Sequence, residues 1–452
     1  MLITHIKELI GNTPILKLDP KIHGLKTYDI YIKLEYMNPF GSVKDRVGLA
    51  LIEPFMEELK AKNKTILEAS SANTGKALAA LCSIEGLKFK SYTNRVKVPE
   101  QRMILQALGS EIEELPGLSD CPDPNDPNDP TKYCEDLVNQ GPEKYHYTNQ
   151  YFNELNPEIH RKTTAKEIYE DLGAVDILVT PLGTCGTSQG TIDYLKEKNP
   201  SLKSIGVVSE PGSWVPGNRN LNELWEVGIY KEEKYDEILQ DDYMNSIEGA
   251  IELLTKAGVF CGPTTGLQYQ CIVKKLRFEE ENKVKEGIIL ENSKENKKKV
   301  IFIGCDRIEP YLNYIKRYKP EIFSSKTTTR PRVNTQTLDD VSLTNSIKPK
   351  ELKYLIDSKD ENGFIIIDIR GHFAYSIGHI KDSINILDEL FATLIEEGPS
   401  FPKNKKIVVV CSIGMISRKF ASFLSVQGYD ASNLEGGIMN WKKEGFEVLK
   451  TN

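Results

Sequence analysis

Asn38-Pro39-Phe40-Gly41-Ser42-Val43-Lys44-Asp45-Arg46 is the stretch that decides both the fold and the chemistry of this chain. Tyr31 to Leu34, just before it, has the pattern of a short buried strand, and apolar residues recur at helical spacing from Val43 onward. Ser42 is then the expected N-cap of a helix. Lys44 would lie in the first turn, where the positive end of the helix dipole disfavours its charge and helps to lower its pKa. A neutral amine can form a Schiff base, although a solvated surface lysine fits this stretch equally well.

The composition indicates a globular protein of two or three domains. The chain has 452 residues, of which 39% are hydrophobic and 27% charged, and no apolar run approaches the length of a membrane span. We therefore expect no membrane partner. The opening MLITHIKELIGNTP lacks the charged-then-apolar order of a signal peptide, so we expect a cytoplasmic protein. A net charge of -7 argues against a nucleic-acid partner.

The eight cysteines are scattered without paired spacing, which indicates reduced thiols rather than a disulfide framework. Cys121 and Cys134 flank proline, aspartate and asparagine residues, and we expect residues 117–134 to be an inserted surface loop. A metal or disulfide clip is conceivable there. Two thiols without nearby histidines are a weak signal for such a site, so we expect no metal.

Residues 1–325 alternate strand-like and helical patterns, as expected of a parallel α/β fold whose ligand sites follow the strands. The first loop of interest follows a strand from Thr65 to Leu67. It is Ser70-Ser71-Ala72-Asn73-Thr74-Gly75, and it leads into a helix from Lys76 to Leu81. Backbone N–H groups at such a helix start bind a carboxylate or a phosphate, although a plain N-cap loop has the same pattern.

Two later loops add to this picture. Gly183-Thr184-Cys185-Gly186-Thr187 follows a strand from Val175 to Val179 and precedes a helix, so it predicts a phosphate site made of neutral donors. It lacks the lysine of a nucleotide-cleaving loop, which favours a cofactor that stays bound. Cys261-Gly262-Pro263-Thr264-Thr265-Gly266 is the third, where a hydroxyl could face a ring nitrogen, although such a turn is common.

An activated lysine, a carboxylate loop and a metal-free phosphate loop together describe a pyridoxal 5'-phosphate site. Residues 5–320 resemble the cysteine synthase and cystathionine β-synthase family of fold-type II pyridoxal-phosphate enzymes. Ile10-Gly11-Asn12-Thr13-Pro14, the lysine stretch and the three loops match this family in order. The resemblance implies two parallel-sheet subdomains and a homodimer.

The resemblance also implies residue roles. Lys44 would be the Schiff-base lysine and the base that takes the substrate α-proton. The cofactor-binding residues would be Lys44, Asn73, Gly183, Thr184, Cys185, Gly186, Thr187 and Thr264. The substrate carboxylate would lie among Ser71, Asn73, Thr74 and Gln150. Ala72, Cys185 and Pro310 depart from the family's usual residues, so the shape of the substrate site is open.

The expected reaction follows from Thr264. A hydroxyl cannot keep the pyridine nitrogen protonated as a carboxylate would, which favours β-elimination over transamination. We expect β-replacement on an activated serine, O-acetylserine or O-phosphoserine, with sulfide or a thiol, to give cysteine or a thioether amino acid. The alternatives are an amine nucleophile, as in diaminopropionate-precursor synthases, cysteine breakdown to hydrogen sulfide, and a cofactor-binding scaffold without catalysis.

A second α/β unit is expected at residues 345–452, after a polar linker at residues 326–344. Phe364 to Arg370 and Lys406 to Val410 have the pattern of buried strands. Cys411-Ser412-Ile413-Gly414-Met415-Ile416-Ser417 follows the second strand, before a helix from Arg418 to Val426. A cysteine whose loop N–H groups lead into a helix start is expected to be nucleophilic, although a buried structural cysteine is the alternative.

Residues 345–450 resemble a single rhodanese domain, including Gly378-His379-Ile380 and Leu434 to Trp441. The resemblance implies that Cys411 is catalytic and carries a persulfide, with a thiol reductant as a further partner besides the amino-acid and sulfur substrates. Ile416 stands where many rhodaneses place arginine. We expect sulfur to pass to or from the Lys44 site, the alternative being a sensing or docking module without catalysis.

Overall fold

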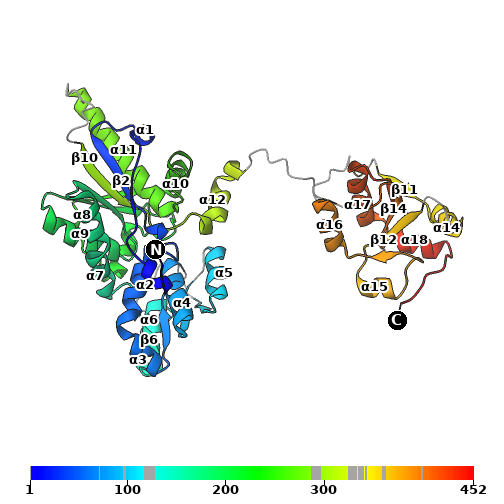
Figure 1. The fold of residues 1–452 in the computed structure, drawn as a ribbon, viewed down its shortest axis with the longest axis horizontal. Coiled ribbons are helices and arrows are strands. Elements are labelled where there is room, and N and C mark those ends of the chain that lie inside the picture. The colour runs from blue at the N-terminus through cyan, green and yellow to red at the C-terminus, as the bar shows by residue number, and fades with distance from the viewer. Residues whose placement is uncertain are drawn as a thin grey trace. The chain divides into compact units, whose positions relative to one another are not determined.

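The computed structural model describes residues 2–70, 72–94, 98–116, 128–286, 297–323, 333, 341, 344–358, 363–398 and 401–451. The chain forms two compact units, Met1–Phe323 and Ser324–Asn452, each considered by itself (Figure 1). Apart from Val333, Val341 and Thr344, the expected linker at 326–344 lies outside the described residues. Val333 is buried in the core of the second unit.

Unit 1 contains two sheets. The six-stranded sheet has the spatial order β1 (Ile15–Lys17), β2 (Tyr28–Lys33), β10 (Lys298–Ile303), β7 (Ile177–Pro181), β8 (Lys203–Ser209) and β9 (Glu237–Asp241). The four-stranded sheet has the order β5 (Glu111–Glu114), β4 (Lys88–Thr93), β3 (Thr65–Glu68) and β6 (Tyr145–Tyr147). Every pairing is parallel except β1 with β2. The expected pair of parallel-sheet subdomains is confirmed.

Helices cover both sheets of unit 1. They are α1 (Pro20–His23), α2 (Lys44–Ile52), α3 (Met56–Ala61), α4 (Asn73–Glu85), α5 (Pro99–Ala107), α6 (Pro130–Gln140), α7 (Leu155–Lys162), α8 (Thr164–Leu172), α9 (Gly186–Lys198), α10 (Tyr243–Ala257), α11 (Pro263–Lys285) and α12 (Leu312–Tyr318). Figure 1 shows α3 to α6, in blue and cyan, around the smaller sheet and α7 to α11, in green, around the larger one. Helix α2 packs against α4 and α7 and so lies between the two groups.

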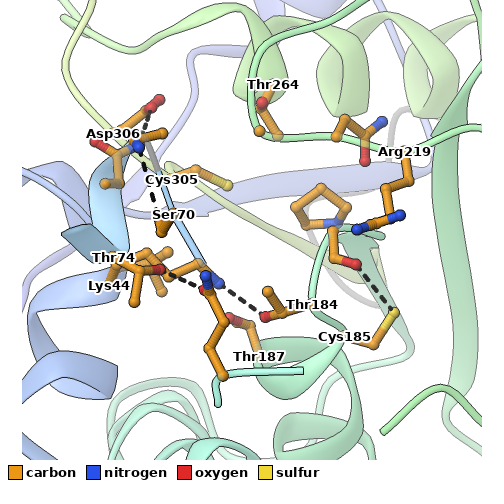
Figure 2. A pocket seen from close by; sticks show the side chains of 18 of the residues that line it. Lys44, Ser70, Thr74, Thr184, Cys185, Thr187, Arg219, Thr264, Cys305 and Asp306 are labelled. Atoms are coloured by element: carbon orange, nitrogen blue, oxygen red, sulfur yellow. Dashed lines mark hydrogen bonds between the residues drawn. The ribbon is translucent and has the colours of Figure 1, made fainter. Parts of the chain in front are cut away.

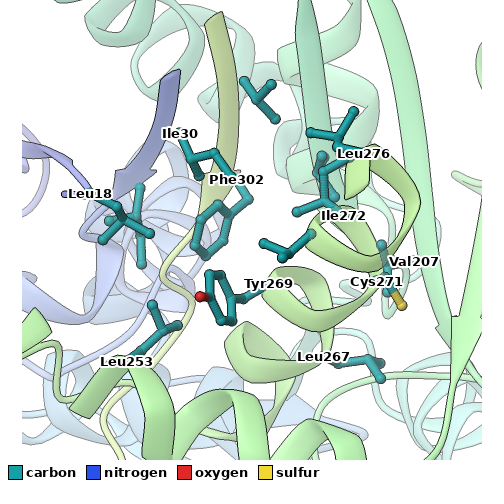
Figure 3. Close-up of a cluster of buried hydrophobic side chains, with 14 of the residues drawn as sticks. Leu18, Ile30, Val207, Leu253, Leu267, Tyr269, Cys271, Ile272, Leu276 and Phe302 are labelled. Carbon is teal, nitrogen blue, oxygen red and sulfur yellow. The ribbon is translucent and has the colours of Figure 1, made fainter. Parts of the chain in front are cut away.

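The core of unit 1 forms because its central strands are apolar on both faces. In β10 the run from Val300 to Ile303 is completely buried, as expected of a parallel strand that is covered on both sides. On one face Phe302 packs near Tyr269 of α11, with ring centroids 6.2 Å apart, among the aliphatic side chains shown in Figure 3. This packing fixes the loops that follow the strands.

Short 3-10 helices connect several of these elements. They are η1 (Ile6–Leu9), η2 (Glu35–Met37), η3 (Glu53–Phe55), η4 (Leu221–Glu226), η5 (Glu232–Lys234), η6 (Glu309–Tyr311) and η7 (Pro320–Phe323).

A buried ion network holds the helix that begins at Lys44. The Arg46 guanidinium, 1% exposed, contacts Glu35 at 2.8 Å and Glu167 at 2.6 Å. Lys33 also contacts Glu167, at 2.8 Å. The Thr13 hydroxyl donates to Glu35 at 2.7 Å, so the N-terminal motif and the lysine stretch meet at this network. It joins the N-terminal stretch from Thr13 to Arg46 to Glu167, which lies 121 positions after Arg46.

Unit 2 is a single parallel sheet with helices. Its strands, in spatial order, are β11 (Asn345–Ile347), β15 (Ala431–Leu434), β14 (Lys406–Val410), β12 (Phe364–Asp368) and β13 (Ile384–Asn385). The helices are α14 (Pro349–Ser358), α15 (His372–Ser376), α16 (Asp388–Glu397), α17 (Met415–Val426) and α18 (Gly437–Lys443). Phe391 of α16 stacks on Phe420 of α17 at 5.3 Å inside its core.

Several expected boundaries are wrong. The inserted loop expected at 117–134 includes the start of α6, because Asp129 caps this helix with its carboxylate and Pro130 occupies the first turn. Cys134 lies in that helix and is completely buried. Cys121 lies outside the described residues, so the structure does not address a clip between the two cysteines. The described part of the chain contains no helix that is long and apolar enough to span a membrane.

Candidate active sites

A cavity of about 320 Å³ in unit 1 gathers most of the residues expected at the first site. Figure 2 shows it from close by, with Lys44 and Thr74 on one side and Thr264 and Arg219 on the other. The expected residues that line it are Lys44, Asn73, Thr74, Gln150, Gly183, Thr184, Cys185, Thr187 and Thr264. Gly186 does not line the cavity. Ser71 lies outside the described residues.

Lys44 is the first residue of α2, and its amine reaches the cavity. Its Nζ donates to Thr184 Oγ1 at 3.1 Å. Burial is the main cause that lowers the pKa of the Lys44 ammonium. The expectation that Ser42 is the N-cap is wrong by one residue, because Val43 takes this place. The Ser42 hydroxyl still accepts from the Lys44 N–H, at 3.2 Å.

Helix α4 begins at Asn73, three residues before the expected start, so Asn73 and Thr74 belong to its first turn. The Asn73 side-chain amide donates to Asp306 Oδ2 at 2.6 Å. The Tyr311 hydroxyl donates to the same carboxylate at 2.5 Å. Burial raises the pKa of Asp306, against the effect of these hydrogen bonds. The carboxylate therefore fixes the orientation of the Asn73 amide, with its oxygen left for another donor.

Gln150 is held between Thr74 of α4 and Glu68 of β3. The Thr74 hydroxyl donates to Gln150 Oε1 at 2.5 Å, and Gln150 Nε2 donates to Glu68 Oε1 at 3.3 Å. Thr148 donates to the other Glu68 oxygen at 2.5 Å. Glu68 is fully buried, which raises the pKa of its carboxyl to about 7. Glu68 was not expected from the sequence, because it is the last residue of a strand with no motif.

The loop from Gly183 to Thr187 requires small residues for steric reasons. A Cβ on Gly183 would lie 2.7 Å from the Gly217 carbonyl oxygen, and one on Gly186 would lie 1.9 Å from Asn156 Oδ1. Cys185 has a φ of 60° and takes the left-handed N-cap position of α9. The Thr187 hydroxyl lies 3.2 Å from Nε2 of the buried His160. The loop thus presents backbone N–H groups at the start of a 13-residue helix.

Thr264 lies in the first turn of α11 rather than in a free turn, because Pro263 already begins this helix. Its hydroxyl donates to the Pro216 carbonyl oxygen. Helix α11 packs against the larger sheet and Pro216 lies in the connection between β8 and β9, so Thr264 is fixed on the side of the cavity away from Thr74 (Figure 2).

Further lining residues were missed, and several of them are polar or charged. Asn218, Arg219 and Glu223 lie in the segment between β8 and β9, which has no recognisable motif. Arg219 donates to Glu226 at 2.6 Å and lies over the Tyr151 ring at 5.1 Å. Asp306 belongs to the run Asp306 to Leu312, whose resemblance to the family's tail segment was the signal that could have found it.

The cavity fits pyridoxal phosphate on the chemistry of its walls. Among the described residues, Asn73 Oδ1, Asp306 Oδ1 and both polar atoms of the Asn218 amide are buried without a protein partner. Such atoms call for a ligand. The loop at Gly183 suits a phosphate, and the Lys44 amine suits a carbonyl group. In the described part of the chain, no three His, Cys, Asp or Glu side chains are placed to hold a metal.

Cys411 forms a second site, in unit 2. Its Sγ accepts from the Gly414 N–H at 3.1 Å, the Ser417 N–H at 3.4 Å and the Ser417 hydroxyl at 3.2 Å. Cys411 is only 4% exposed and follows β14 directly. Helix α17 begins at Met415, three residues before the expected start, with Gly414 as its N-cap at φ 84°. The loop therefore stabilises a negative charge on sulfur with neutral donors.

Comparisons with known proteins identify the family of this chain. Residues 6–290 match the family model of pyridoxal-phosphate dependent enzymes, and residues 348–444 match the rhodanese-like domain. The chain belongs to the family of pyridoxal-phosphate dependent enzymes and carries a C-terminal rhodanese-like domain.

Within this family the chain is similar to cysteine synthases. Cysteine synthase B of Pseudomonas aeruginosa is 30% identical over 319 residues, which are 68% of this chain and 95% of that protein. The structure of a hydrogen sulfide-producing enzyme from Fusobacterium nucleatum is 29% identical with a TM-score of 0.57, over 69% of this chain and 99% of that one.

The structure of an O-acetylserine dependent cystathionine beta-synthase from Helicobacter pylori is 28% identical with a TM-score of 0.56, over 69% of this chain and 98% of that one. The expected fold-type II pyridoxal-phosphate enzyme fused to a rhodanese domain is confirmed.

Proposed function

We propose that unit 1 catalyses β-replacement on an activated serine, O-acetylserine or O-phosphoserine, with sulfide or a thiol as nucleophile. The product is cysteine or a thioether amino acid. The observation that carries this proposal is the convergence of the Lys44 amine, the Thr74–Gln150 pair and the Gly183 loop on one cavity. The similarity to cysteine synthases supports it.

Residues on each wall of the cavity have a role in the proposed reaction. Bound there, pyridoxal phosphate supplies the electron sink for breaking a bond at the substrate Cα. Lys44 holds the cofactor carbonyl carbon before substrate binds and then takes the α-proton on Nζ. Its lowered pKa leaves more of the amine neutral for this task, and Thr184 positions Nζ by its hydrogen bond.

The substrate carboxylate is bound at the start of α4. The Thr74 hydroxyl and the Gln150 amide face the cavity, and Glu68 anchors the amide from behind. Ser71 belongs to this proposed group on the sequence alone. Thr187 and the N–H groups at the start of α9 hold the cofactor phosphate, and Asn73 and Thr264 hold its ring.

The test is a Lys44→Ala variant of the full chain, with Lys62→Ala, an exposed lysine on the same unit, as control. We expect Lys62→Ala to keep the visible absorbance of the bound cofactor, a bond that borohydride reduces, and full activity. Lys44→Ala should lose the reducible bond, and its activity should fall by about a thousandfold or more. A reducible bond that survives in Lys44→Ala would refute the assignment.

A screen of serine derivatives against sulfide, thiols and amines identifies the substrates. The amines in this screen test the alternative of an amine nucleophile. A separate assay with cysteine as the only substrate tests the release of hydrogen sulfide. The similarity to a hydrogen sulfide-producing enzyme favours this last reaction as the second candidate. If no pair gives a product, unit 1 is a cofactor-binding scaffold.

We propose that Cys411 carries sulfane sulfur that is used or released at the Lys44 site. A covalent tether between two sites gives effective concentrations on the order of millimolar. A Cys411 persulfide releases hydrogen sulfide when one thiol attacks its inner sulfur and a second thiol resolves the mixed disulfide, so a thiol reductant is the required partner. The described cysteines are all free thiols, which supports a reducing, cytoplasmic location.

The coupling is tested with a sulfane-sulfur donor and no free sulfide. β-Replacement product is followed in the intact enzyme, in Cys411→Ser, and in an equimolar mixture of full-length Cys411→Ser and Lys44→Ala. We expect the intact enzyme to be fastest, and dilution to slow the mixture more than the intact enzyme. Equal rates in all three would show that the rhodanese domain senses or docks a partner instead.

We propose that the protein is a homodimer. A groove in unit 1 is lined by apolar residues, among them Phe40, Ile104 and Leu108, and by the charged Lys76, Arg307 and Glu309. Near these lining residues in the sequence, Met103 is 60% exposed and Met37 is 52% exposed. An apolar surface of this kind is typical of an interface. Light scattering of Ile104→Glu against the wild type tests it, since a wild type that is monomeric at working concentrations would refute the proposal.

A further inference from the structure

The loop of Cys411 has no charged side chain between Ser412 and Ser417. The three hydrogen bonds to Sγ come from the Gly414 N–H, the Ser417 N–H and the Ser417 hydroxyl, all of them neutral donors. These donors stabilise one negative charge, on the sulfur itself. They offer nothing to a second charge on an incoming molecule.

The segment that follows Cys411 exposes apolar side chains instead. Ile413 is 57% exposed, Met415 70% and Ile416 51%, although each belongs to the same short segment as the buried sulfur. Large aliphatic groups exposed together at a reactive residue indicate a surface that binds an apolar body. The rest of unit 2 does not need them for its core, which lies beneath the loop.

The neighbouring elements add little positive charge. Arg370, just after β12, is 9% exposed. Its guanidinium pairs with Asp368 at 2.7 Å and donates to the Gly378 carbonyl oxygen at 2.8 Å. The segments after β15 and β13 carry the carboxylates of Glu435 and Asp388. Because parallel strands end at one edge of a sheet, these carboxylates lie at the edge where Cys411 lies.

Arg418 and Lys419 are the cations nearest to Cys411 in sequence. Both belong to the second turn of α17 and are exposed. Arg418 has no ion pair in the described part of the chain. If Cys411 took its sulfur from an anionic donor, Arg418 would be the side chain expected to bind that donor.

From this geometry we infer that Cys411 takes its sulfur from an organic persulfide with an uncharged, apolar body, and not from the thiosulfate dianion. The inference rests on the proposed sulfur transfer at Cys411 and names its donor. A dianion would meet the thiolate and nearby carboxylates without a fixed cation to compensate them. The neutral form R–S–SH, which is the form that a thiolate attacks, brings no second charge, and its R group contacts Ile413 and Ile416.

The transfer step balances without an added oxidant. The Cys411 thiolate attacks the outer sulfur of R–S–SH, a bond forms between the two sulfurs, and the original S–S bond breaks. The bonding electron pair leaves with R–S⁻, which takes a proton from water. Cys411 is left as a persulfide, and its outer sulfur keeps the proton of the donor.

The experiment measures loading of Cys411 in the full-length holoenzyme by intact-protein mass spectrometry. The donors are tert-butyl hydropersulfide and thiosulfate, and each rate is divided by the rate of the same donor with free N-acetylcysteine. We expect this ratio to be larger for the alkyl persulfide by about tenfold or more. Cys411→Ser identifies the loaded residue.

Three variants decide the reason for the preference. Ile416→Arg should raise loading from thiosulfate by about tenfold and lower loading from the alkyl persulfide. Ile416→Leu, the matched neutral control, should change neither. Arg418→Gln should also change neither, since the inference gives this side chain no part in binding the donor.

Two results would overturn the inference. One is a wild type that favours thiosulfate, and the other is a loss of thiosulfate loading in Arg418→Gln, which would show that a cation serves an anionic donor. A third result would refute more than the choice of donor. If neither donor loads Cys411, the proposed sulfur transfer at Cys411 is wrong.

Discussion

The two residues proposed to be reactive, Lys44 and Cys411, lie in sites that are built in opposite ways. The Lys44 amine lies in a cavity whose walls come from residues 43 to 306, and buried charges support those walls. The Cys411 sulfur is held by donors that all lie within six residues of it. A site of the first kind depends on the whole unit, whereas one of the second kind is a property of a single loop. The two should respond differently to single substitutions.

The supporting charges show the contrast most clearly. Arg46 lies two residues from Lys44 and is surrounded by carboxylates from η2 and α8, both fixed by long-range packing. In unit 2 a buried charge that follows β12, the strand beside β14, is Arg370, whose partner Asp368 is two residues away. The Lys44 site should therefore be the one that fails when a distant ion pair is broken.

Arg46→Ala is expected to have the largest effect. Removing the guanidinium leaves Glu35 and part of Glu167 buried without their partner, which costs about 3–5 kcal/mol of the free energy of unfolding. Unit 1 should unfold at lower denaturant and lose cofactor, while the proposed loading of Cys411 with sulfur should not change. Chemical denaturation followed by cofactor absorbance measures the first effect, and persulfide loading measures the second.

The control for Arg46→Ala is Arg161→Ala. Arg161 pairs with Glu197 at 2.7 Å, but both side chains are exposed, so the loss should be small. If the two variants were equally stable, the buried network would not be what holds α2. If Arg46→Ala also abolished loading of Cys411, the two sites would not be independent.

Glu68→Gln is expected to change the pH dependence of stability. Burial raises the pKa of Glu68 from 4.5 to about 7. Below pH 4.5 the carboxyl is protonated in both states. Between pH 4.5 and about 7 it ionises only in the unfolded chain, so folding stability falls as the pH rises, by about 3 kcal/mol in total. Above that range the loss is complete.

Glutamine does not ionise, so the variant should lack this loss. The quantity to measure is the difference in unfolding free energy between wild type and variant from pH 4 to pH 8, with the exposed Glu57→Gln as control. A difference that stays constant across this range would show that Glu68 is ionised in the folded protein. The Gln150 hydrogen bond would then be stronger than proposed.

The contrast between the sites also explains what the sequence could predict. Lys44, the loop at Gly183 and the Cys411 loop were found because each lies in one continuous motif at the end of a strand. Both helix starts that were placed three residues late, Asn73 and Met415, follow loops whose small polar residues have no sharp boundary in the sequence.

Residues that act from a distance could not be found in this way. Glu68 and Arg219 have ordinary sequence neighbours, and only folding brings them to Gln150 and Tyr151. Their positions depend on the register of parallel strands and on the path of a long connection, which local pattern does not determine. The order of the motifs predicted the fold well because central strands such as β7 and β14 are apolar and each is followed by a helix.

Ser417→Ala is the smallest expected effect and tests the local site. The Ser417 hydroxyl donates to Cys411 Sγ at 3.2 Å, while two backbone donors stay in place. A hydrogen bond to a charged group contributes about 1.5 kcal/mol at the low end of its range, so alkylation of Cys411 by iodoacetamide should slow by about tenfold. Ser412→Ala, on the exposed side of the loop, should not change the rate. Cofactor absorbance in unit 1 should be the same in both variants, because no residue of the Lys44 site takes part in the Cys411 loop. Equal alkylation rates in the two variants would mean that the backbone N–H groups of Gly414 and Ser417 alone activate the sulfur. The Cys411 site would then depend on the backbone of its loop and not on the side chains of the loop.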